Sequence, residues 1–263
     1  MGLKQAMLKR INPSEEVSVN TKPGIIQKVL PAIAMVEDVS LAAAGRRVGD
    51  YIVGTAFVAD DRGYFLTAKH VVQGILAKDI KVRTAYSGAE AGGYAFSIMP
   101  VTAIYPHPSV DIAVLAIGKR LSSARASLPL ETGDAAVGSD ILLVGYATGT
   151  DLVFCDEILG HGSPKSLSPV AFGGMICARV PDDGRPLDLF AYDCTTFGGN
   201  SGAPVVSVDT GNIIGLHLRG YENHVGYGIP IDLCMPFVST VVTLHEEQKE
   251  RQRNAKAARR LAR

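Results

Sequence analysis

Three residues whose side chains could together carry out nucleophilic catalysis lie in three separate motifs of the chain. His70 lies in the segment LTAKHVV, Asp111 opens the segment DIAVL, and Ser201 lies in the segment GGNSGAPV. An imidazole can take the proton of a serine hydroxyl, and a carboxylate can hold that imidazole in the required tautomer. The residue types therefore predict a serine nucleophile, provided that the fold brings the three side chains together.

The surroundings of Asp111 and Ser201 fit these roles. Asp111 begins a stretch that is apolar on both faces of a strand, so its carboxylate should be largely desolvated and needs a hydrogen-bond donor. An imidazole N–H would supply one. Ser201 lies in a glycine-rich segment, GGNSG, that leads into an apolar strand. Glycines permit a tight turn with free backbone N–H groups, which an oxyanion formed at Ser201 would need.

These residues have to be positioned by β-strands. Between about residues 31 and 231 the chain consists of short apolar runs separated by Gly, Pro, Asp and Asn, a pattern typical of an all-β sandwich or barrel. The runs are Ile52–Ala59, Tyr64–Thr67, Ile80–Thr84, Asp111–Ile117, Ile141–Tyr146, Ala203–Val208, Ile213–Leu218 and Val225–Pro230.

The two ends of the chain differ from this β-rich body. Residues 1–30 are polar and contain Pro13 and Pro23, so we expect a loosely attached N-terminal arm. Residues 232–263 are expected to form a C-terminal helix, apolar on one side at first and then strongly charged, with a basic tail. We expect that tail to be a solvated, frayed end rather than a contact with a nucleic acid or a membrane.

In the order His, Asp, Ser and on an all-β background, these motifs resemble those of the chymotrypsin-fold serine peptidases. The similarity includes GTAF at 54–57 and covers residues 31–240. It implies two packed six-stranded β-barrels, the first at about 31–128 and the second at about 129–231, with the active site in the cleft between them. The GNSG sequence makes the chain look more like the bacterial glutamyl endopeptidase and HtrA-like branches than like the animal digestive members.

The resemblance also implies a role for each site residue. Ser201 would attack the carbonyl carbon of a peptide bond, His70 would take its proton and pass it to the leaving amine, and Asp111 would orient His70. The backbone N–H groups of Gly199 and Ser201 would form the oxyanion hole. The implied function is a serine endopeptidase that cuts protein or peptide substrates without a metal or cofactor. The alternative is a catalytically silent member of the fold that binds peptides along a strand. The intact motifs favour the enzyme.

Residues near Ser201 bear on the side chain preferred before the cut. Thr195 stands where trypsin-like members carry an acid, so a preference for Lys or Arg is disfavoured. The segment GLHLRG at 215–220 resembles the strand where glutamyl endopeptidases and viral 3C-like proteases place a histidine that reads Glu or Gln. We therefore expect Thr196 and His217 to line a pocket for Glu or Gln. The alternative is that His217 is a buried structural histidine and Thr196 merely a wall residue.

Charge and composition bear on other classes of function. The chain has 26 basic and 26 acidic side chains, and this balance argues against long-range attraction to polyanions, so we expect no nucleic-acid and no membrane partner. The balance is uneven, because residues 245–263 carry a net charge of +4 and the rest carries −4. The N-terminus lacks the apolar region of a secretory signal, and no apolar stretch approaches the roughly 20 residues of a membrane span. We expect a cytoplasmic protein.

The cysteines predict neither a metal site nor a disulfide framework. Cys155, Cys177, Cys194 and Cys234 form no C-x-x-C pair and have no zinc-like spacing with a histidine. We expect four buried thiols that act as small apolar side chains.

Overall fold

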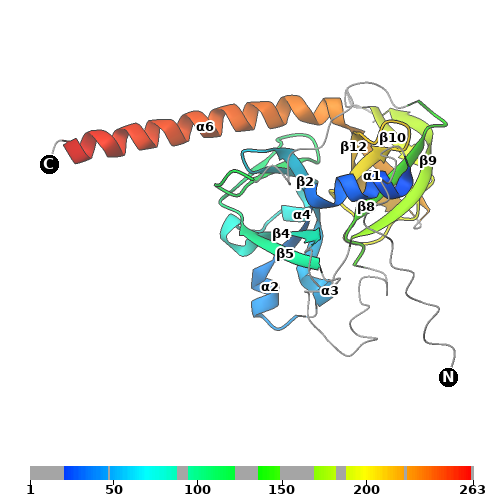
Figure 1. Ribbon diagram of the computed structural model, residues 1–263, viewed down its shortest axis with the longest axis horizontal. Coiled ribbons are helices and arrows are strands. Elements are labelled where there is room, and N and C mark those ends of the chain that lie inside the picture. The colour runs from blue at the N-terminus through cyan, green and yellow to red at the C-terminus, as the bar shows by residue number, and fades with distance from the viewer. Residues whose placement is uncertain are drawn as a thin grey trace.

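The computed structural model describes residues 21–46, 48–87, 94–121, 136–148, 169–181, 188–221 and 224–261. Two β-structures lie side by side, and one long helix runs from the second across the first and then projects from the body (Figure 1). This arrangement confirms the all-β fold class with a C-terminal helix that the sequence predicts.

The first half is a seven-stranded antiparallel sheet in the order β5-β4-β1-β2-β3-β7-β6. Its strands are β1 (Ile33–Asp38), β2 (Ile52–Asp60), β3 (Tyr64–Thr67), β4 (Ile80–Ser87), β5 (Tyr94–Pro100), β6 (Ala103–Pro106) and β7 (Ala113–Ala116). The interior strand β1 is buried at every position. The expected strands at 52–59, 64–67, 80–84 and 111–117 are all present, with ends that differ by a few residues.

The expected six-stranded barrel is present in this half as a half-barrel sheet with one strand more, and the reason for the extra strand is a bend. The N–H of Val101 donates to the carbonyl of Ile80 at 3.1 Å, whereas the N–H of Thr102 donates to the carbonyl of Ala116 at 2.7 Å. At these two residues the chain therefore stops pairing with β4 and starts pairing with β7. The bend divides one run of chain into β5 and β6, which lie at the two ends of the sheet.

The second half is a closed six-stranded barrel, as predicted, in the order β10-β13-β12-β11-β8-β9. Its strands are β8 (Asp140–Gly145), β9 (Val170–Pro181), β10 (Asp188–Tyr192), β11 (Pro204–Ser207), β12 (Ile213–Tyr221) and β13 (Val225–Pro230). Alternate residues of β8 and β11, such as Ile141, Leu143 and Val205, are fully buried inside the barrel.

The N-terminal arm expected over 1–30 is wrong for its last part, since Lys22–Val29 forms helix α1. Thr21 caps this helix by accepting a hydrogen bond from the N–H of Gly24. Ile25 and Val29, one turn apart, are fully buried in the core. Pro23 suits the first turn of a helix, where its missing N–H is not needed, so it marks a helix start rather than a loose segment. Residues 1–20 of the expected arm lie outside the described residues.

Three short helices and one 3₁₀ turn connect strands of the first half, and another 3₁₀ turn follows α1. They are η1 (Leu30–Ala32), α2 (Val39–Ala43), α3 (Val48–Tyr51), α4 (Lys69–Val72) and η2 (Ala77–Asp79). Only α4 takes part in the candidate site. The expectation of buried thiols is confirmed for Cys194 and Cys234 and is wrong for Cys177, which is exposed; all three are free, and Cys155 lies outside the described residues.

The long helix α6 (Ile231–Leu261) begins one residue before its predicted start. Cys234, Val238 and Val242 bury one face of it near the barrel. Further along, Tyr64 of β3 bonds through its hydroxyl to Nδ1 of His245 at 3.0 Å and donates to Glu246 at 2.7 Å. The helix thereby ties the two halves together. No helix in the described part of the chain combines the length and apolar character that spanning a membrane requires.

Candidate active site

His70 and Asp111 are brought together by the pairing of β3 with β7. The two strands are antiparallel, with Thr67 opposite Ala113, so the end of β3 meets the start of β7. His70 follows β3 on the single turn α4, and Asp111 lies just before β7. Nδ1 of His70 lies 2.7 Å from one carboxylate oxygen of Asp111, and the backbone N–H of His70 donates to the other at 2.9 Å.

The Asp111 carboxylate is stabilised in its charged form. Burial alone would raise its pKa, but the hydrogen bonds from the ring and the backbone N–H of His70 outweigh burial and hold the pKa below the usual value. A carboxylate on Nδ1 favours the tautomer that carries its proton on this nitrogen. Nε2 of His70 is then a free proton acceptor.

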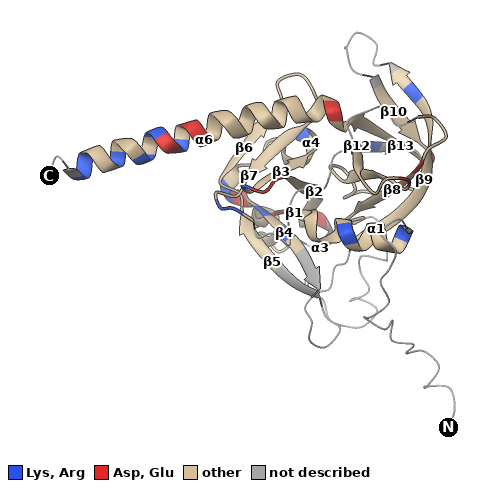
Figure 2. Cartoon of the chain, turned by 45° about the horizontal axis from the view of Figure 1, so that its top comes forward, with Lys and Arg blue, Asp and Glu red and all other residues tan. Residues whose placement is uncertain are grey.

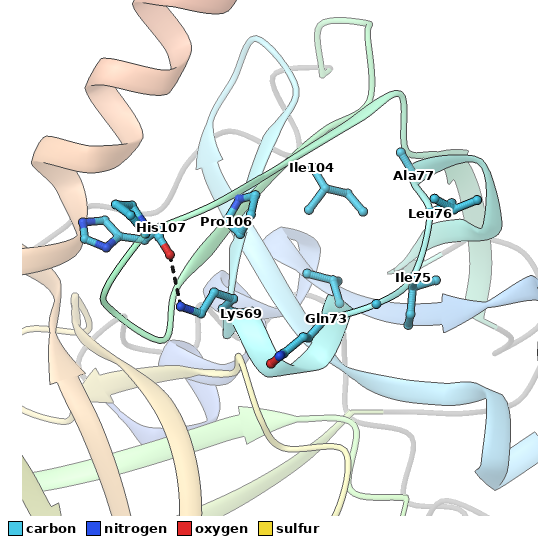
Figure 3. A pocket seen from close by; sticks show the side chains of 11 residues that line it. Lys69, Gln73, Ile75, Leu76, Ala77, Ile104, Pro106 and His107 are labelled. Atoms are coloured by element: carbon cyan, nitrogen blue, oxygen red, sulfur yellow. Dashed lines mark hydrogen bonds between the residues drawn. The ribbon is translucent and has the colours of Figure 1, made fainter.

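The loop before Asp111 is organised by His107. Nδ1 of His107 accepts hydrogen bonds from the N–H groups of Val110, at 2.9 Å, and Ser109, at 3.2 Å. Lys69, the neighbour of His70, donates to the carbonyl of His107 at 3.1 Å (Figure 3). Burial and the charge of Lys69 both lower the pKa of His107. His107 therefore acts as a neutral structural residue that fixes the approach to Asp111.

A pocket of about 610 Å³ adjoins this loop (Figure 3). Its walls come from α4, from the segment after it and from β6, and they are mainly apolar, including Val72, Ile75, Leu76 and Ile104. Because α4 also carries His70, this pocket can seat an apolar side chain of a ligand that lies along the site.

Ser201 is presented by a turn that only glycine can form. The N–H of Asn200 donates to the carbonyl of Phe197 at 3.2 Å, with Gly199 at φ +87° between them. A Cβ on Gly199 would lie 2.1 Å from the carbonyl oxygen of Tyr146. Gly202, at φ +85°, is equally constrained, since its Cβ would lie 2.1 Å from the carbonyl oxygen of Thr55.

The same turn leaves two backbone donors free beside the Ser201 side chain. The carbonyl of Gly198 accepts from the N–H of Thr148 at 2.7 Å. Because the C=O and N–H of a trans peptide point in opposite directions, this bond turns the N–H of Gly199 away from Thr148. Within the described residues, the N–H groups of Gly199 and Ser201 have no acceptor. They are the two donors that the resemblance implies for an oxyanion.

Thr55 holds this loop from the other half of the molecule. Its N–H donates to the carbonyl of Ser201 at 2.9 Å, and its hydroxyl donates to the carbonyl of Gly199 at 2.7 Å. The same hydroxyl accepts from the N–H of Tyr146 at 2.9 Å. Sequence reasoning included Thr55 in the GTAF match but gave it no role, because its partners in the loop lie more than 140 residues further along the chain.

Ser201 lies close to the His70 helix, but its hydroxyl is engaged elsewhere. A Cβ on Gly54 would touch both the side chain of Val71, at 2.7 Å, and the carbonyl of Ser201, at 2.9 Å. The Ser201 hydroxyl donates to the carbonyl of Leu218 at 3.0 Å. The described contacts include no hydrogen bond between Ser201 and His70. The fold thus brings the three predicted residues to one site, with His70 and Asp111 paired and Ser201 turned toward β12.

A family model described as a trypsin-like peptidase domain matches residues 54–216, which include all three of these residues. The chain belongs to this family. Serine protease HTRA4 of Homo sapiens is 24% identical over 230 residues, covering 85% of this chain and 41% of that protein. Putative serine protease HhoA of Synechocystis sp. is 26% identical over 191 residues, covering 72% of this chain and 42% of that protein. The chain spans about two fifths of the length of these relatives.

Solved structures with the same fold include bacterial proteases. The serine endoprotease from Yersinia pestis superposes with a TM-score of 0.58 at 21% identity, over 83% of this chain and 65% of that chain. The active form of the Rv3671c protease from M. tuberculosis superposes with a TM-score of 0.56 at 19% identity, over 81% of this chain and 82% of that chain. These likenesses support the chymotrypsin-like fold of this peptidase domain.

The two residues expected to line a specificity pocket are both deeply buried in this peptidase domain. His217 on β12 is 1% exposed, and Thr196 is 2% exposed. Thr196 packs against the β12 backbone, where a Cβ on Gly220 would collide with its hydroxyl. Nδ1 of His217 is hydrogen-bonded to the hydroxyl of Tyr192, a partner for which the sequence carries no signal. No contact between Thr196 and His217 occurs among the described interactions.

Burial sets the charge of the His217–Tyr192 pair. Desolvation, with a smaller effect of His70, lowers the pKa of the His217 imidazole to about 3. Burial likewise raises the pKa of the Tyr192 phenol well above its usual value. Both side chains are therefore neutral near pH 7, and His217 offers a neutral donor or acceptor rather than a positive charge.

Proposed function

We propose that this chain is a serine endopeptidase that hydrolyses peptide bonds through an acyl-enzyme on Ser201. The observation that carries the proposal is the double hydrogen bond between His70 and Asp111, because it leaves Nε2 of His70 free as a general base. The N–H groups of Gly199 and Ser201, which have no acceptor in the described part of the chain, support the same assignment.

The chemical steps follow from these groups. Nε2 of His70 takes the proton of the Ser201 hydroxyl while the oxygen bonds to the substrate carbonyl carbon, and the N–H groups of Gly199 and Ser201 stabilise the resulting oxyanion. His70 then gives the proton to the leaving amine as the C–N bond breaks, which leaves an acyl-enzyme. Water, deprotonated by His70, repeats the sequence on the ester and restores the Ser201 hydroxyl. Asp111 stabilises the imidazolium in both halves.

The substrate would bind as an extra strand along β12. β11 pairs with β12 only at Ile213–Leu216, whereas β13 pairs as far as Tyr221. Among the described residues, nothing pairs with one edge of β12 beyond His217, next to Ser201, and an extended peptide can pair with it. A substrate N–H that bonds to the carbonyl of Leu218 would displace the Ser201 hydroxyl from it. The hydroxyl is then free to turn to His70.

We further propose that the side chain preferred before the cut is Gln, and Glu less so. If Tyr192 donates to Nδ1 of His217, then Nε2–H can donate to the carbonyl of Gln. In the other tautomer, Nε2 can accept from the amide of Gln. Only the first tautomer suits a Glu carboxylate, and burying that charge beside a neutral imidazole costs free energy. A carboxamide is served by both tautomers.

A fluorophosphonate probe, which reacts with activated serines, tests the activity. We expect labelling of the folded protein at Ser201, located by peptide mapping, and none of the Ser201→Ala variant. A correctly folded protein that stays unlabelled both without and with a peptide that pairs with β12 would contradict the proposal.

A second candidate function, a silent peptide-binding module, is favoured by the bond between the Ser201 hydroxyl and the carbonyl of Leu218. The same probe separates the two functions. A module would bind peptides along β12 with the serine unlabelled, even when peptide is present.

A further inference from the structure

The charges of α6 are segregated along its length. Over its last turns the helix is exposed at every described position, and all its charged residues after Glu250 are cations. These cations are Arg251, Arg253, Lys256, Arg259 and Arg260. Figure 2 shows them along the part of the helix that projects beyond the body. Although the charge of the whole chain is balanced, the C-terminal part of α6 is strongly positive.

A cationic pocket of about 300 Å³ lies where this positive part of α6 begins. It lies where α6 passes the turn between β2 and β3 and the segment after β7. Its charged lining consists of Arg62, Lys119, Arg120, Lys249 and Arg253, with Glu246 as the one acid among the residues that line it. Five positive side chains and one negative side chain therefore share a small concave surface.

The walls of this pocket are held in place by the fold. The N–H of Ile117 donates to the carbonyl of Gly63 at 3.0 Å, and the N–H of Leu121 donates to that of Asp61 at 2.8 Å. The bond from Tyr64 to Glu246 fixes α6 against the same turn. These bonds hold the backbone segments that carry the cations close to one another. The cations therefore converge because of the fold.

Some of these cations already have partners within the protein. Asp60 binds Arg62 through both carboxylate oxygens, at 2.7 and 2.8 Å, and Glu246 binds Lys249 at 2.8 Å. Asp61 binds Arg120 at 3.1 Å. Among the described residues, Lys119 and Arg253 form no ion pair. Arg253 both lines the pocket and begins the exposed cationic row, so the pocket and Lys256, Arg259 and Arg260 form one continuous region, called here the basic surface.

We propose that the basic surface binds the phosphate backbone of a nucleic acid strand. Arg outnumbers Lys in it, and the planar guanidinium group matches phosphate oxygens with two parallel hydrogen bonds. A pocket that can hold one phosphate, followed by a row of cations along a helix, suits a linear polyanion. Such binding is independent of base sequence, because phosphate contacts carry no sequence information.

The composition of the helix disfavours other anionic partners. After Glu246 its apolar side chains are three alanines and Leu261, which is too little to bury in a membrane surface. A protein partner would need a buried apolar or aromatic anchor, and the basic surface has none among the residues that line it.

A nucleic acid on the basic surface would leave the candidate active site open. Strand β3 runs from the pocket, at the turn that contains Arg62, to His70 beyond its other end. The two sites therefore lie at opposite ends of one strand. Binding would hold the peptidase near proteins that associate with the same nucleic acid.

Fluorescence anisotropy with labelled single-stranded and duplex oligonucleotides tests this proposal, in a Ser201→Ala background that prevents self-cleavage. The test variant combines Arg253→Gln, Lys256→Gln, Arg259→Gln and Arg260→Gln. The control removes the same net charge elsewhere, through Lys22→Gln, Lys28→Gln, Lys78→Gln and Lys81→Gln. Circular dichroism of both variants verifies that α6 is still helical.

We expect the unmodified surface to bind oligonucleotides with a Kd on the order of 10⁻⁴ to 10⁻⁶ M near physiological salt, more tightly as salt falls. The test variant should bind about tenfold or more weakly. Its plot of log Kd against log salt should be flatter by about 0.7 for each phosphate of a single strand that the substituted side chains no longer neutralise. The control should stay within about twofold of the parent.

Three results would overturn the proposal. They are the absence of oligonucleotide binding at low salt, equal weakening in the test and control variants, and binding to anionic phospholipid vesicles or polyglutamate in place of oligonucleotides. None of them depends on peptidase activity.

Discussion

The hydroxyl of Ser201 donates to the carbonyl oxygen of Leu218, 3.0 Å away, on the edge of β12 that a substrate strand would occupy. In this state the hydroxyl is stabilised away from His70. A peptide that pairs with β12 would compete for the same acceptor, and so substrate binding and activation of the nucleophile are linked through one oxygen atom.

This link predicts that the N–H of the residue before the cut matters more to turnover than to binding. Methylation of that nitrogen in a peptide substrate should lower kcat/KM about fivefold, the equivalent of one hydrogen bond of roughly 1 kcal/mol, mainly through kcat. Steady-state kinetics on matched methylated and unmethylated peptides measure it. The same methyl group two residues beyond the cut serves as the control, and equal losses at both positions would contradict the link.

Thr55 is predicted to be a positioning residue for the oxyanion loop. Thr55→Val keeps the shape but removes the hydroxyl that bonds to the carbonyl of Gly199 and the N–H of Tyr146, so one partly buried and one buried backbone group each lose a partner. We expect stability to fall by about 2 kcal/mol and kcat to fall by about tenfold or more, with KM little changed. Thr55→Ser, which restores the hydroxyl, should recover most of kcat. A variant series in which stability falls while kcat does not would assign Thr55 a purely structural role.

Gly199 is predicted to tolerate no side chain. Gly199→Ala imposes φ +87° on alanine and places Cβ 2.1 Å from the carbonyl of Tyr146, so the turn must rearrange and the oxyanion donors move. The matched control is Gly138→Ala, at φ +97° with no atom within 4 Å of its Cβ. The control should lose about 1 kcal/mol and keep its activity, whereas Gly199→Ala should lose activity by about a hundredfold or more. Unfolding curves and kcat for both variants provide the test, and an active Gly199→Ala enzyme would refute the assigned geometry.

His217 is predicted to remain neutral over the working pH range. Its folded-state pKa of about 3 lies below the unfolded value of about 6.5, so the unfolded state binds more protons between the two values. Stability should therefore fall as the pH drops below about 6.5 toward 3, and His217→Phe should flatten this dependence in denaturant titrations.

Because His217 is neutral, we expect the preference for Gln over Glu to be independent of pH near neutrality. The ratio of kcat/KM for Gln over Glu peptides should be constant between about pH 6 and 8, because no proton binds His217 there. Tyr192→Phe should reduce this ratio severalfold, whereas the distant His245→Gln should leave it unchanged. A preference for Lys, Arg or small aliphatic residues would contradict the proposed pocket.

Short local motifs were sufficient to select residues that the fold brings together. His70, Asp111 and Ser201 each lie in a short segment whose strand ending or glycine turn is encoded by its neighbours, and the structure places them at one site. The second barrel and the long helix α6 were also predicted, since alternating apolar runs and a long charged segment are local signals. Membership of the trypsin-like peptidase family confirms the resemblance drawn from these motifs.

What the sequence did not provide depends on contacts between distant segments. Thr55 acquires its role only when β2 packs against the Ser201 loop, and Tyr192 only when β10 lies beside β12 in the closed barrel. Helix α1 was missed because two buried residues, Ile25 and Val29, are too few to show a helical period. The seventh strand of the first sheet arises from a bend after Pro100, and a lone proline does not distinguish a bend from the end of a strand.

Cleavage of a Gln-containing peptide tests the central claim most directly. The folded wild-type protein should hydrolyse the peptide bond after Gln, and Ser201→Ala or His70→Ala should each lower kcat by on the order of 10⁶. A folded wild-type protein that cuts no peptide or protein substrate, or a Ser201→Ala variant that cuts at the wild-type rate, would show that this site is not a serine endopeptidase.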